Sequence, residues 1–430
     1  MPDTMTDQER RVVDAVDRGF DRQLAFTQDL VRFASLRGHE ATIQDYVFAA
    51  LNTRGLAMDR WRLREVDLAD HPGFGPVSEA HYDNAWNVVG SWRPGSESGR
   101  SLILNAHVDV VPPGPRDMWE TAPFDPVVRD GWMHGRGSAD MKAGLAANIF
   151  AFDAVRAAGF DPAATVHIQS VVEEESTGNG TLATSIRGYR ADAVICPEPE
   201  DEKVVRANAG VVWFSVCVRG RPAHTRVMQS GLNAIDGAYK VIAALRELEA
   251  AANADRVRHR YFAGLDHPLN LNIGRIEGGD WNSSVPAECT VHCRFAMYPG
   301  IAADTVRKAV EECIAALARS EAAFRNNPPE VRWTGFFAEG FVLEPGTEAE
   351  RTLAAAHQSV FAKPLEDLVT PAYLDARVTM LYDKIPTLVY GPTSRGVHGI
   401  DEAVEIESVR RITKTIALFM ARWCGLTRRV

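Results

Sequence analysis

The sequence predicts an α/β protein with a mostly parallel sheet and helices on both faces, into which a smaller two-layer α+β domain is inserted. Two observations lead to this prediction. Short apolar runs typical of strands alternate with helical segments over the first 208 residues. Near Ala209 the order changes to β-α-β-β-α-β, and the alternation resumes near Glu344. We therefore expect a discontinuous larger domain of residues 1–208 and 342–430, and an inserted domain of residues 209–341.

The elements of the larger domain follow from the spacing of its apolar residues. Apolar residues on one stripe predict helices at residues 20–31, 43–51, 145–155 and 406–424. Short apolar runs bounded by turn-forming or charged residues predict a strand that begins at Leu102, and others at residues 84–92, 165–172, 191–196 and 387–390.

The inserted domain has a different pattern. Residues 211–219 alternate apolar and polar side chains, as a half-exposed strand does. Further strands are expected at residues 270–276, 287–296 and 331–337, and helices at residues 233–251 and 301–318. This order is typical of a small two-layer α+β domain.

The composition excludes several classes of protein. The chain has 430 residues, of which 46% are hydrophobic and 24% charged, as in an ordinary globular protein. A formal charge of −10 without a basic stripe argues against a nucleic-acid binder. No signal-peptide pattern and no run of 18 apolar residues is found, and the six cysteines are scattered. We therefore expect a cytoplasmic protein with no membrane or nucleic-acid partner.

Residues of the types that commonly bind metals stand at the ends of the predicted strands. His107 and Asp109 come at the end of the strand that begins at Leu102, and residues two apart on a strand share a face. Open α/β sheets place their ligands at this end of the strands. Taken alone, a His-x-Asp pair is more often a solvent-facing strand end than a metal site.

Four further candidates follow later strands or loops. Asp140 stands at a loop-to-helix junction, where an aspartate is most often a helix N-cap. The run 173–175 consists of three glutamates, which elsewhere is usually a solvated turn. Glu198 lies between two prolines, and His398 lies in a loop near the C-terminus. Mixed nitrogen and oxygen ligands of this kind suit zinc, with cobalt or manganese as alternatives.

This set of motifs resembles the dinuclear-zinc metallopeptidase family that includes acetylornithine deacetylase, succinyl-diaminopimelate desuccinylase, aminoacylase and glutamate carboxypeptidase. The resemblance covers the chain from about Leu24 to Cys424. It implies a zinc-peptidase-like catalytic domain that holds two divalent ions. The resemblance also assigns a role to each candidate: His107 and Glu198 as ligands of one metal, Glu175 and His398 as ligands of the other, Asp140 as the bridging carboxylate, Asp109 as the partner that orients His107, and Glu174 as the general base.

In the inserted domain the resemblance implies a lid that also forms a homodimer. Residues 220–224 and 231–234 resemble the lid motif, whose histidine, His224 here, reaches the active site of the partner subunit. Arg294 matches an arginine that contacts the carboxylate of the substrate. Ser283 stands where many relatives have asparagine, and Asn282 beside it is the alternative source of that amide.

These observations predict an enzyme that hydrolyses the amide bond of an N-acyl amino acid with a metal-bridged water and Glu174 as base. The alternative within the family is a dipeptidase or carboxypeptidase. A metal-binding protein that has lost catalysis is less favoured, because Glu174 and the full ligand set are present. Asp375 and Arg377, in a stretch that resembles the deacetylase branch, are candidates for either a substrate contact or structural pairing.

Overall fold

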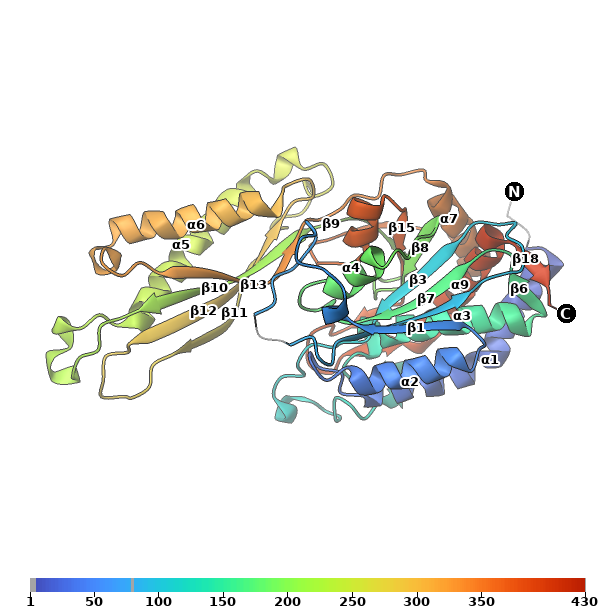
Figure 1. The fold of residues 1–430 in the computed structure, drawn as a ribbon, viewed down its shortest axis with the longest axis horizontal. Helices are drawn as coiled ribbons and strands as arrows, with labels where there is room; N and C mark the ends of the chain where they lie inside the picture. The colour runs from blue at the N-terminus through green and yellow to red at the C-terminus, as the bar shows by residue number, and fades with distance from the viewer. Residues whose placement is uncertain (1–4, 79–80, 430) are drawn as a thin grey trace.

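The computed structural model describes residues 5–78 and 81–429 and has two lobes (Figure 1). The larger lobe contains a six-stranded sheet with helices packed against it. The smaller lobe contains a four-stranded sheet with two helices, and its chain leaves and re-enters the larger lobe. No helix among the described residues has both the length and the apolar character that crossing a membrane requires.

The sheet of the larger lobe is mixed. Its strands, in spatial order, are β1 (Ala57–Arg62), β2 (Trp86–Trp92), β7 (Val166–Val171), β3 (Leu102–His107), β8 (Ala193–Cys196) and β15 (Thr387–Val389). The pairs β7–β3, β3–β8 and β8–β15 are parallel, whereas β1–β2 and β2–β7 are antiparallel. The prediction of a mostly parallel sheet was therefore wrong at this edge. In the described residues only a single 3-10 turn, Leu63–Glu65, lies between β1 and β2, and no α-helix does, whereas a parallel neighbour needs a long crossover connection that is usually a helix.

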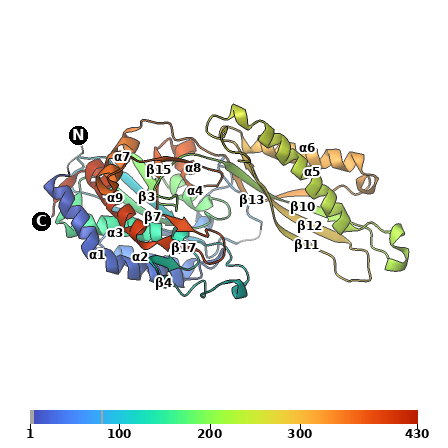
Figure 2. The ribbon, with the colours of Figure 1, turned by 180° about the vertical axis from the view of Figure 1, so that it is seen from behind.

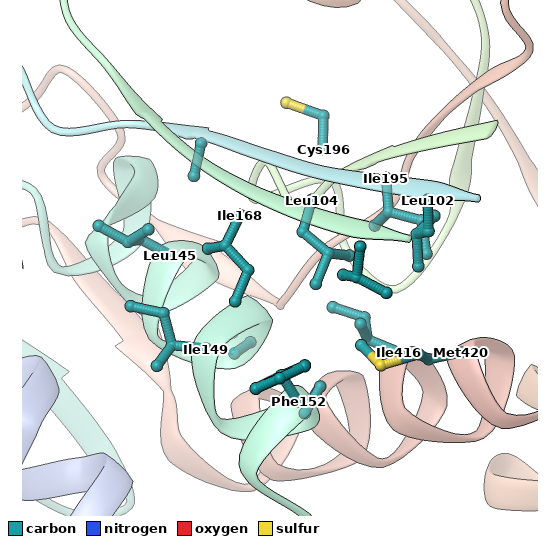
Figure 3. Close-up of a cluster of buried hydrophobic side chains, with 14 of the residues drawn as sticks. Leu102, Leu104, Leu145, Ile149, Phe152, Ile168, Ile195, Cys196, Ile416 and Met420 are labelled. Carbon is teal, nitrogen blue, oxygen red and sulfur yellow. The ribbon is translucent and has the colours of Figure 1, made fainter. Parts of the chain in front are cut away.

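Helices cover both faces of this sheet. On one face, Leu102 and Leu104 of β3 pack against Ile149 and Phe152 of α3 (Ala143–Ala157) and against residues of α9 (Ile406–Cys424) (Figure 3). On the other face, the amide of Asn105 donates a hydrogen bond to Oγ1 of Thr181, 3.1 Å away, in α4 (Asn179–Ile186). Because side chains alternate along a strand, His107 shares the face of Asn105.

The remaining helices complete the larger lobe. Helix α1 (Asp7–Arg32) begins with a capping box in which Thr6 and Glu9 satisfy each other's backbone amides. It packs on α3 and α9 (Figure 2). The others are α2 (Ala41–Asn52), α7 (Glu348–Phe361) and the single turn α8 (Ala376–Val378).

The smaller lobe is an antiparallel sheet with helices on one face. Its strands, in spatial order, are β11 (Leu271–Gly278), β12 (Glu288–Met297), β10 (Gly210–Arg219) and β13 (Glu330–Ala338), and its helices are α5 (Ala234–Ala254) and α6 (Ala303–Ser320). Helices α5 and α6 lie side by side (Figure 2). Alternate residues of β10, such as Val212, Phe214 and Val216, enter the core beneath the helices. Trp213 therefore points away from that core, toward the larger lobe.

Several short strands have no clear sequence signal. They are β4 (Val127–Arg129), β5 (Trp132–His134), β6 (Phe160–Pro162), β9 (Val204–Asn208), β14 (Asp367–Thr370), β16 (Ser394–Arg395), β17 (Ala403–Glu405) and β18 (Leu426–Arg428). Strand β1 also lacks an apolar run, since five of its six residues are exposed or half-buried at the sheet edge. A period-based prediction does not detect such strands.

Candidate metal centre

His107 is held at the end of β3 by its own neighbours. The Nδ1 atom of its ring lies 2.9 Å from the carbonyl oxygen of Asp109 and 3.6 Å from Oδ1 of the same residue. The Asp109 carboxylate accepts the backbone N–H groups of Glu174 and Glu175, at 3.4 and 3.1 Å. Asp109 therefore connects the orientation of the His107 ring to the position of the two glutamates.

Asp140 lies at the centre of the candidate ligands. Its Oδ1 is 3.0 Å from Nε2 of His107, and its Oδ2 is 3.3 Å from Nε2 of His398. Nε2 of His398 also lies 3.1 Å from the carboxylate of Glu175, and Nε2 of His107 lies 3.8 Å from that of Glu198. The structure thus brings together all five side chains that the sequence motifs suggested as ligands, from segments far apart in the chain.

These side chains form overlapping groups whose donor atoms all lie within 4.8 Å of one another. One group is His107, Asp140 and Glu198, and a second is Asp140, Glu175 and His398. Asp140 belongs to both groups. A third group joins His107 to Glu174 and Glu175. This spacing is close to what one ion with ligand bonds of about 2.0–2.2 Å requires of its ligands.

The electrostatics of the cluster favour a cation. Burial raises the pKa of Glu174 well above its usual value, and Glu198 and Glu175 add to the rise although His107 opposes it. Burial alone would lower the pKa of His398, but Glu175 and Asp140 outweigh it and raise that pKa to about 11. Carboxylates packed this closely need positive charge between them. The donor set therefore fits two divalent ions that share Asp140.

Glu173 has a different role from the two glutamates that follow it. Its carboxylate accepts hydrogen bonds from Arg37 at 2.6 and 2.8 Å, from the Tyr82 hydroxyl at 2.9 Å and from Thr177 at 2.9 Å. Its backbone has a φ of 68°, and its carbonyl accepts the N–H groups of residues 176–178. Glu173 therefore fixes the loop, and it leaves Glu174 and Glu175 to face the other ligands.

A cavity of about 890 Å³ opens over the cluster and separates it from the sheet of the smaller lobe. Asp140, Glu174, Glu175, Glu198 and His398 line one side. Side chains of β10, β11, β12 and β13 line the opposite side, and residues 370–374 close one flank. The volume is within the range of about 300–1,000 Å³ that small-molecule sites occupy.

The model of peptidase family M20/M25/M40 matches residues 103–422 of the chain. This stretch includes all five candidate ligands. The chain belongs to this family. It is therefore a hydrolase, as the sequence motifs predicted.

Two relatives and one solved structure illustrate the range of the M20 family. The chain is 30% identical over 411 residues, with 89% of each chain covered, to an N-formyl-4-amino-5-aminomethyl-2-methylpyrimidine deformylase of Bacillus subtilis. It is 25% identical to a succinyl-diaminopimelate desuccinylase of Bradyrhizobium, with 91% of this chain and 96% of the relative covered. The crystal structure of human carnosine dipeptidase 1 superposes with a TM-score of 0.75 at 14% identity, covering 97% and 99% of the two chains. This last likeness establishes the M20 fold.

The structure separates three predicted residues of this M20 chain from the cluster. His224, Asn282 and Ser283 are exposed residues of the smaller lobe and do not line the cavity. They lie near one another, because His224 forms a β-bridge with Ser284 and the N–H of Thr225 donates to the carbonyl of Ser283. In this arrangement they contribute nothing to the cavity of their own chain.

Arg294 lines the cavity, as a substrate-binding residue would. Asp375 and Arg377, by contrast, are fully buried and do not line it. Asp375 accepts hydrogen bonds from Thr181 and Tyr373, at 2.6 and 2.7 Å, and Arg377 donates to the carbonyl of Gly73 at 2.7 Å. Asp375 and Arg377 were candidates for a substrate contact or for structural pairing, and these contacts support structural pairing.

Arg136 and Glu402 hold the cluster together, although the motifs drew no attention to them. The Glu402 carboxylate accepts the backbone N–H groups of Ala139 and Asp140, at 3.0 and 3.1 Å, and forms a buried ion pair with Arg136. Arg136 also donates to the carbonyl of Gly399, 2.9 Å away, in the loop of His398. The pair therefore ties the two loops that carry Asp140 and His398. The sequence feature that could have pointed to this pair is the position of Glu402, four residues after the candidate ligand His398.

We expect Glu402→Gln to weaken metal binding by about 10- to 100-fold, as loss of groups that orient ligands usually does. The measurement is the metal concentration that half-restores amine release to apo-protein. Asp401→Asn is the control, because within the described residues the Asp401 carboxylate accepts from the backbone N–H of Glu120, which lies outside the cluster. An unchanged metal requirement in the Glu402 variant would show that the pair does not position the ligands.

Proposed function

We propose that this M20 hydrolase removes the acyl group from an N-acyl amino acid. The observation that carries the proposal is Arg294, which faces the cavity and donates a hydrogen bond to the carbonyl of Pro371 at 3.0 Å. Burial lowers its pKa to about 10, and no acidic side chain in the described part of the chain forms an ion pair with it. A desolvated cation of this kind favours an anionic ligand, such as the carboxylate of an amino acid. The relatives named for deformylation and desuccinylation support an acyl group as the part removed.

We further propose that His107, Asp140 and Glu198 hold one divalent ion, and that Asp140, Glu175 and His398 hold the second. Zinc suits this donor set best, and cobalt and manganese are the alternatives. Two such ions, when bound, lower the pKa of a water molecule and polarise the carbonyl of the scissile amide.

Glu174 acts as the general base and then as the general acid of the reaction. It lines the cavity beside the ligands and is 6% exposed. The oxygen of water attacks the amide carbon while the Glu174 carboxylate accepts its proton. When the carbon–nitrogen bond breaks, the same carboxyl group gives that proton to the departing amine. Because burial raises the pKa of Glu174, the group is suited to holding a proton between the two steps.

We propose that the protein acts as a homodimer in which His224 serves the partner's site. His224 stands away from the cavity of its own chain, while apolar side chains around it are exposed: Met228 by 52% and Trp281 by 72%. Strand β11 lies at the edge of its sheet and exposes 48% of Ile276. Exposed apolar residues beside an open strand edge are typical of a subunit interface. His224 of one subunit would stabilise the oxyanion in the other, and Asn282 or Ser283 would accompany it.

A heterodimer of the His224→Ala and Glu174→Ala chains tests this arrangement. The two chains are co-expressed with different tags, and dimers that carry both tags are purified. If His224 acts across the interface, one of the two sites is complete, and we expect about half of the wild-type activity. A heterodimer as inactive as either homodimeric variant would mean that His224 does not serve the partner.

Amine release from a panel of amides tests the reaction itself. The metal-loaded protein is given N-formyl, N-acetyl and N-succinyl amino acids, together with unblocked dipeptides. We expect release from the N-acyl amino acids, and none with the Glu174→Ala variant. Cleavage of the dipeptides alone would contradict a deacylase and favour the dipeptidase alternative.

We also propose the cytoplasm as the location. All six cysteines are free in the structure, and five of them are buried. Free thiols are typical of proteins in a reducing compartment.

A further inference from the structure

The face of the smaller sheet that lines the cavity carries a row of four side chains, one from each strand. Asn272 of β11 and Arg294 of β12 are register partners, and so are Arg294 and Trp213 of β10. Directly opposed residues of antiparallel strands share a face, with their Cβ atoms about 4.5–5.5 Å apart. Phe336 of β13 completes the row, since its ring lies edge-to-face with Trp213 at a centroid distance of 5.0 Å. All four residues line the cavity.

The aromatic half of the row continues into the larger lobe. The ring of Phe336 lies 4.2 Å, centroid to centroid, from that of Tyr373. Tyr373 donates its hydroxyl proton to Asp375 at 2.7 Å, and lines the cavity with Glu174. Trp213, Phe336 and Tyr373 therefore form an aromatic wall between Arg294 and the general base.

The indole ring of Trp213 is held in place by its neighbours. A Cβ atom on Gly335 would lie 2.7 Å from the indole ring of Trp213 and 2.9 Å from the carbonyl oxygen of Ser176. The backbone of Gly335 is thus packed directly against the indole, and the ring of Phe336 contacts it at right angles. A preformed apolar surface of this kind binds a flat ring with little loss of side-chain freedom.

We propose that Trp213 and Phe336 form a subsite that selects N-acyl amino acids with an aromatic side chain. This inference rests on the proposed function, because it takes Arg294 as the site of the substrate carboxylate. In an amino acid the carboxylate and the side chain leave the same α-carbon, so a ligand held at Arg294 places its side chain within one strand spacing. The neighbour of Arg294 on that side is Trp213. On the other side stands Asn272, whose amide can donate to the second oxygen of the same carboxylate.

The test compares kcat/KM for N-acetyl-phenylalanine, N-acetyl-alanine and N-benzoyl-alanine. For the wild-type protein we expect N-acetyl-phenylalanine to be preferred over N-acetyl-alanine by about 10-fold or more. Trp213→Ala should remove most of that preference, measured as the ratio of the two kcat/KM values, and Trp213→Phe should restore part of it. Trp333→Phe is the matched control, because Trp333 packs on the helix side of the same sheet.

The outcomes separate this inference from the function on which it rests. If no N-acyl amino acid is cleaved, the proposed function fails. If all are cleaved but phenylalanine and alanine derivatives react equally, or if Trp213→Ala slows both equally, the subsite is contradicted while the deacylase stands. A preference for N-benzoyl-alanine would also overturn the proposal, since the wall would then receive the acyl group. Binding of N-acetyl-phenylalanine and N-acetyl-alanine to the Glu174→Gln protein, by calorimetry, gives the same comparison without catalysis.

Discussion

Replacing Glu174 by glutamine is expected to lower kcat by about 10²–10⁴-fold, the range typical of a lost general base. The amide of glutamine has the shape of the carboxyl group but accepts no proton. Glu174 is absent from the two groups that share Asp140, so the variant should keep both ions. The expected result is a large loss of turnover with an unchanged metal content, measured by amine release and elemental analysis on the same sample.

Glu200→Gln is the matched control for this prediction. Glu200 is a carboxylate that lines the same cavity, but it belongs to none of the candidate ligand groups. Its replacement should change kcat by less than about 3-fold, as a substitution outside the proton path does. If the Glu174 variant lost its metal as well, Glu174 would be a ligand, in line with the third group that it forms with His107 and Glu175.

Replacing Asp140 by alanine is expected to have the widest effect of any single change at the centre. Asp140 is the one residue that belongs to both groups, and its two oxygens face His107 and His398 at 3.0 and 3.3 Å. Without it, each ion would lose a ligand, and no carboxylate would be shared between the two ions. We expect metal content to fall from two ions per chain to less than one and activity to fall by more than about 10³-fold, well beyond the effect of an orienting residue.

Glu175→Ala provides the comparison for the Asp140 variant. Glu175 shares a group with Asp140 and His398 but not the group of His107, Asp140 and Glu198. Its loss should therefore remove one ion and leave the other. Equal metal loss in the two variants would contradict a shared Asp140.

Three of the candidate ligands could be placed together from the sequence because they stand at strand ends. Strand ends of one sheet meet at one edge, so His107, Glu175 and Glu198 were expected near one another, whereas the roles of Asp140 and His398, which lie in loops, came from the resemblance. The same reasoning could not place Arg136 and Glu402. Their contacts are to backbone amides and carbonyls of loops, and such contacts depend on how the loops meet rather than on any periodic pattern.

The smaller lobe was harder to interpret than the larger one. Its strands and helices were predicted from their periods, and Asn282 or Ser283 was predicted to contribute to substrate binding. The position of Asn272 opposite Arg294 was not predicted, because register across β11 and β12 sets which side chains are neighbours. Strand register comes from pairing between distant segments, and a single sequence does not reveal it. The direction of β2 was missed for a related reason, since it depends on the neighbour that the strand pairs with.

The most direct test of the account is a metal titration of the apo-protein followed by amine release from an N-acetyl amino acid. The protein is stripped with a chelator, and zinc or cobalt is added in steps of half an equivalent. The account predicts that activity is absent at the start, appears as metal is added, and reaches a plateau at two equivalents per chain. Amine release that persists in the stripped protein, or that reaches its plateau at one equivalent, would contradict catalysis by a centre of two ions that share Asp140.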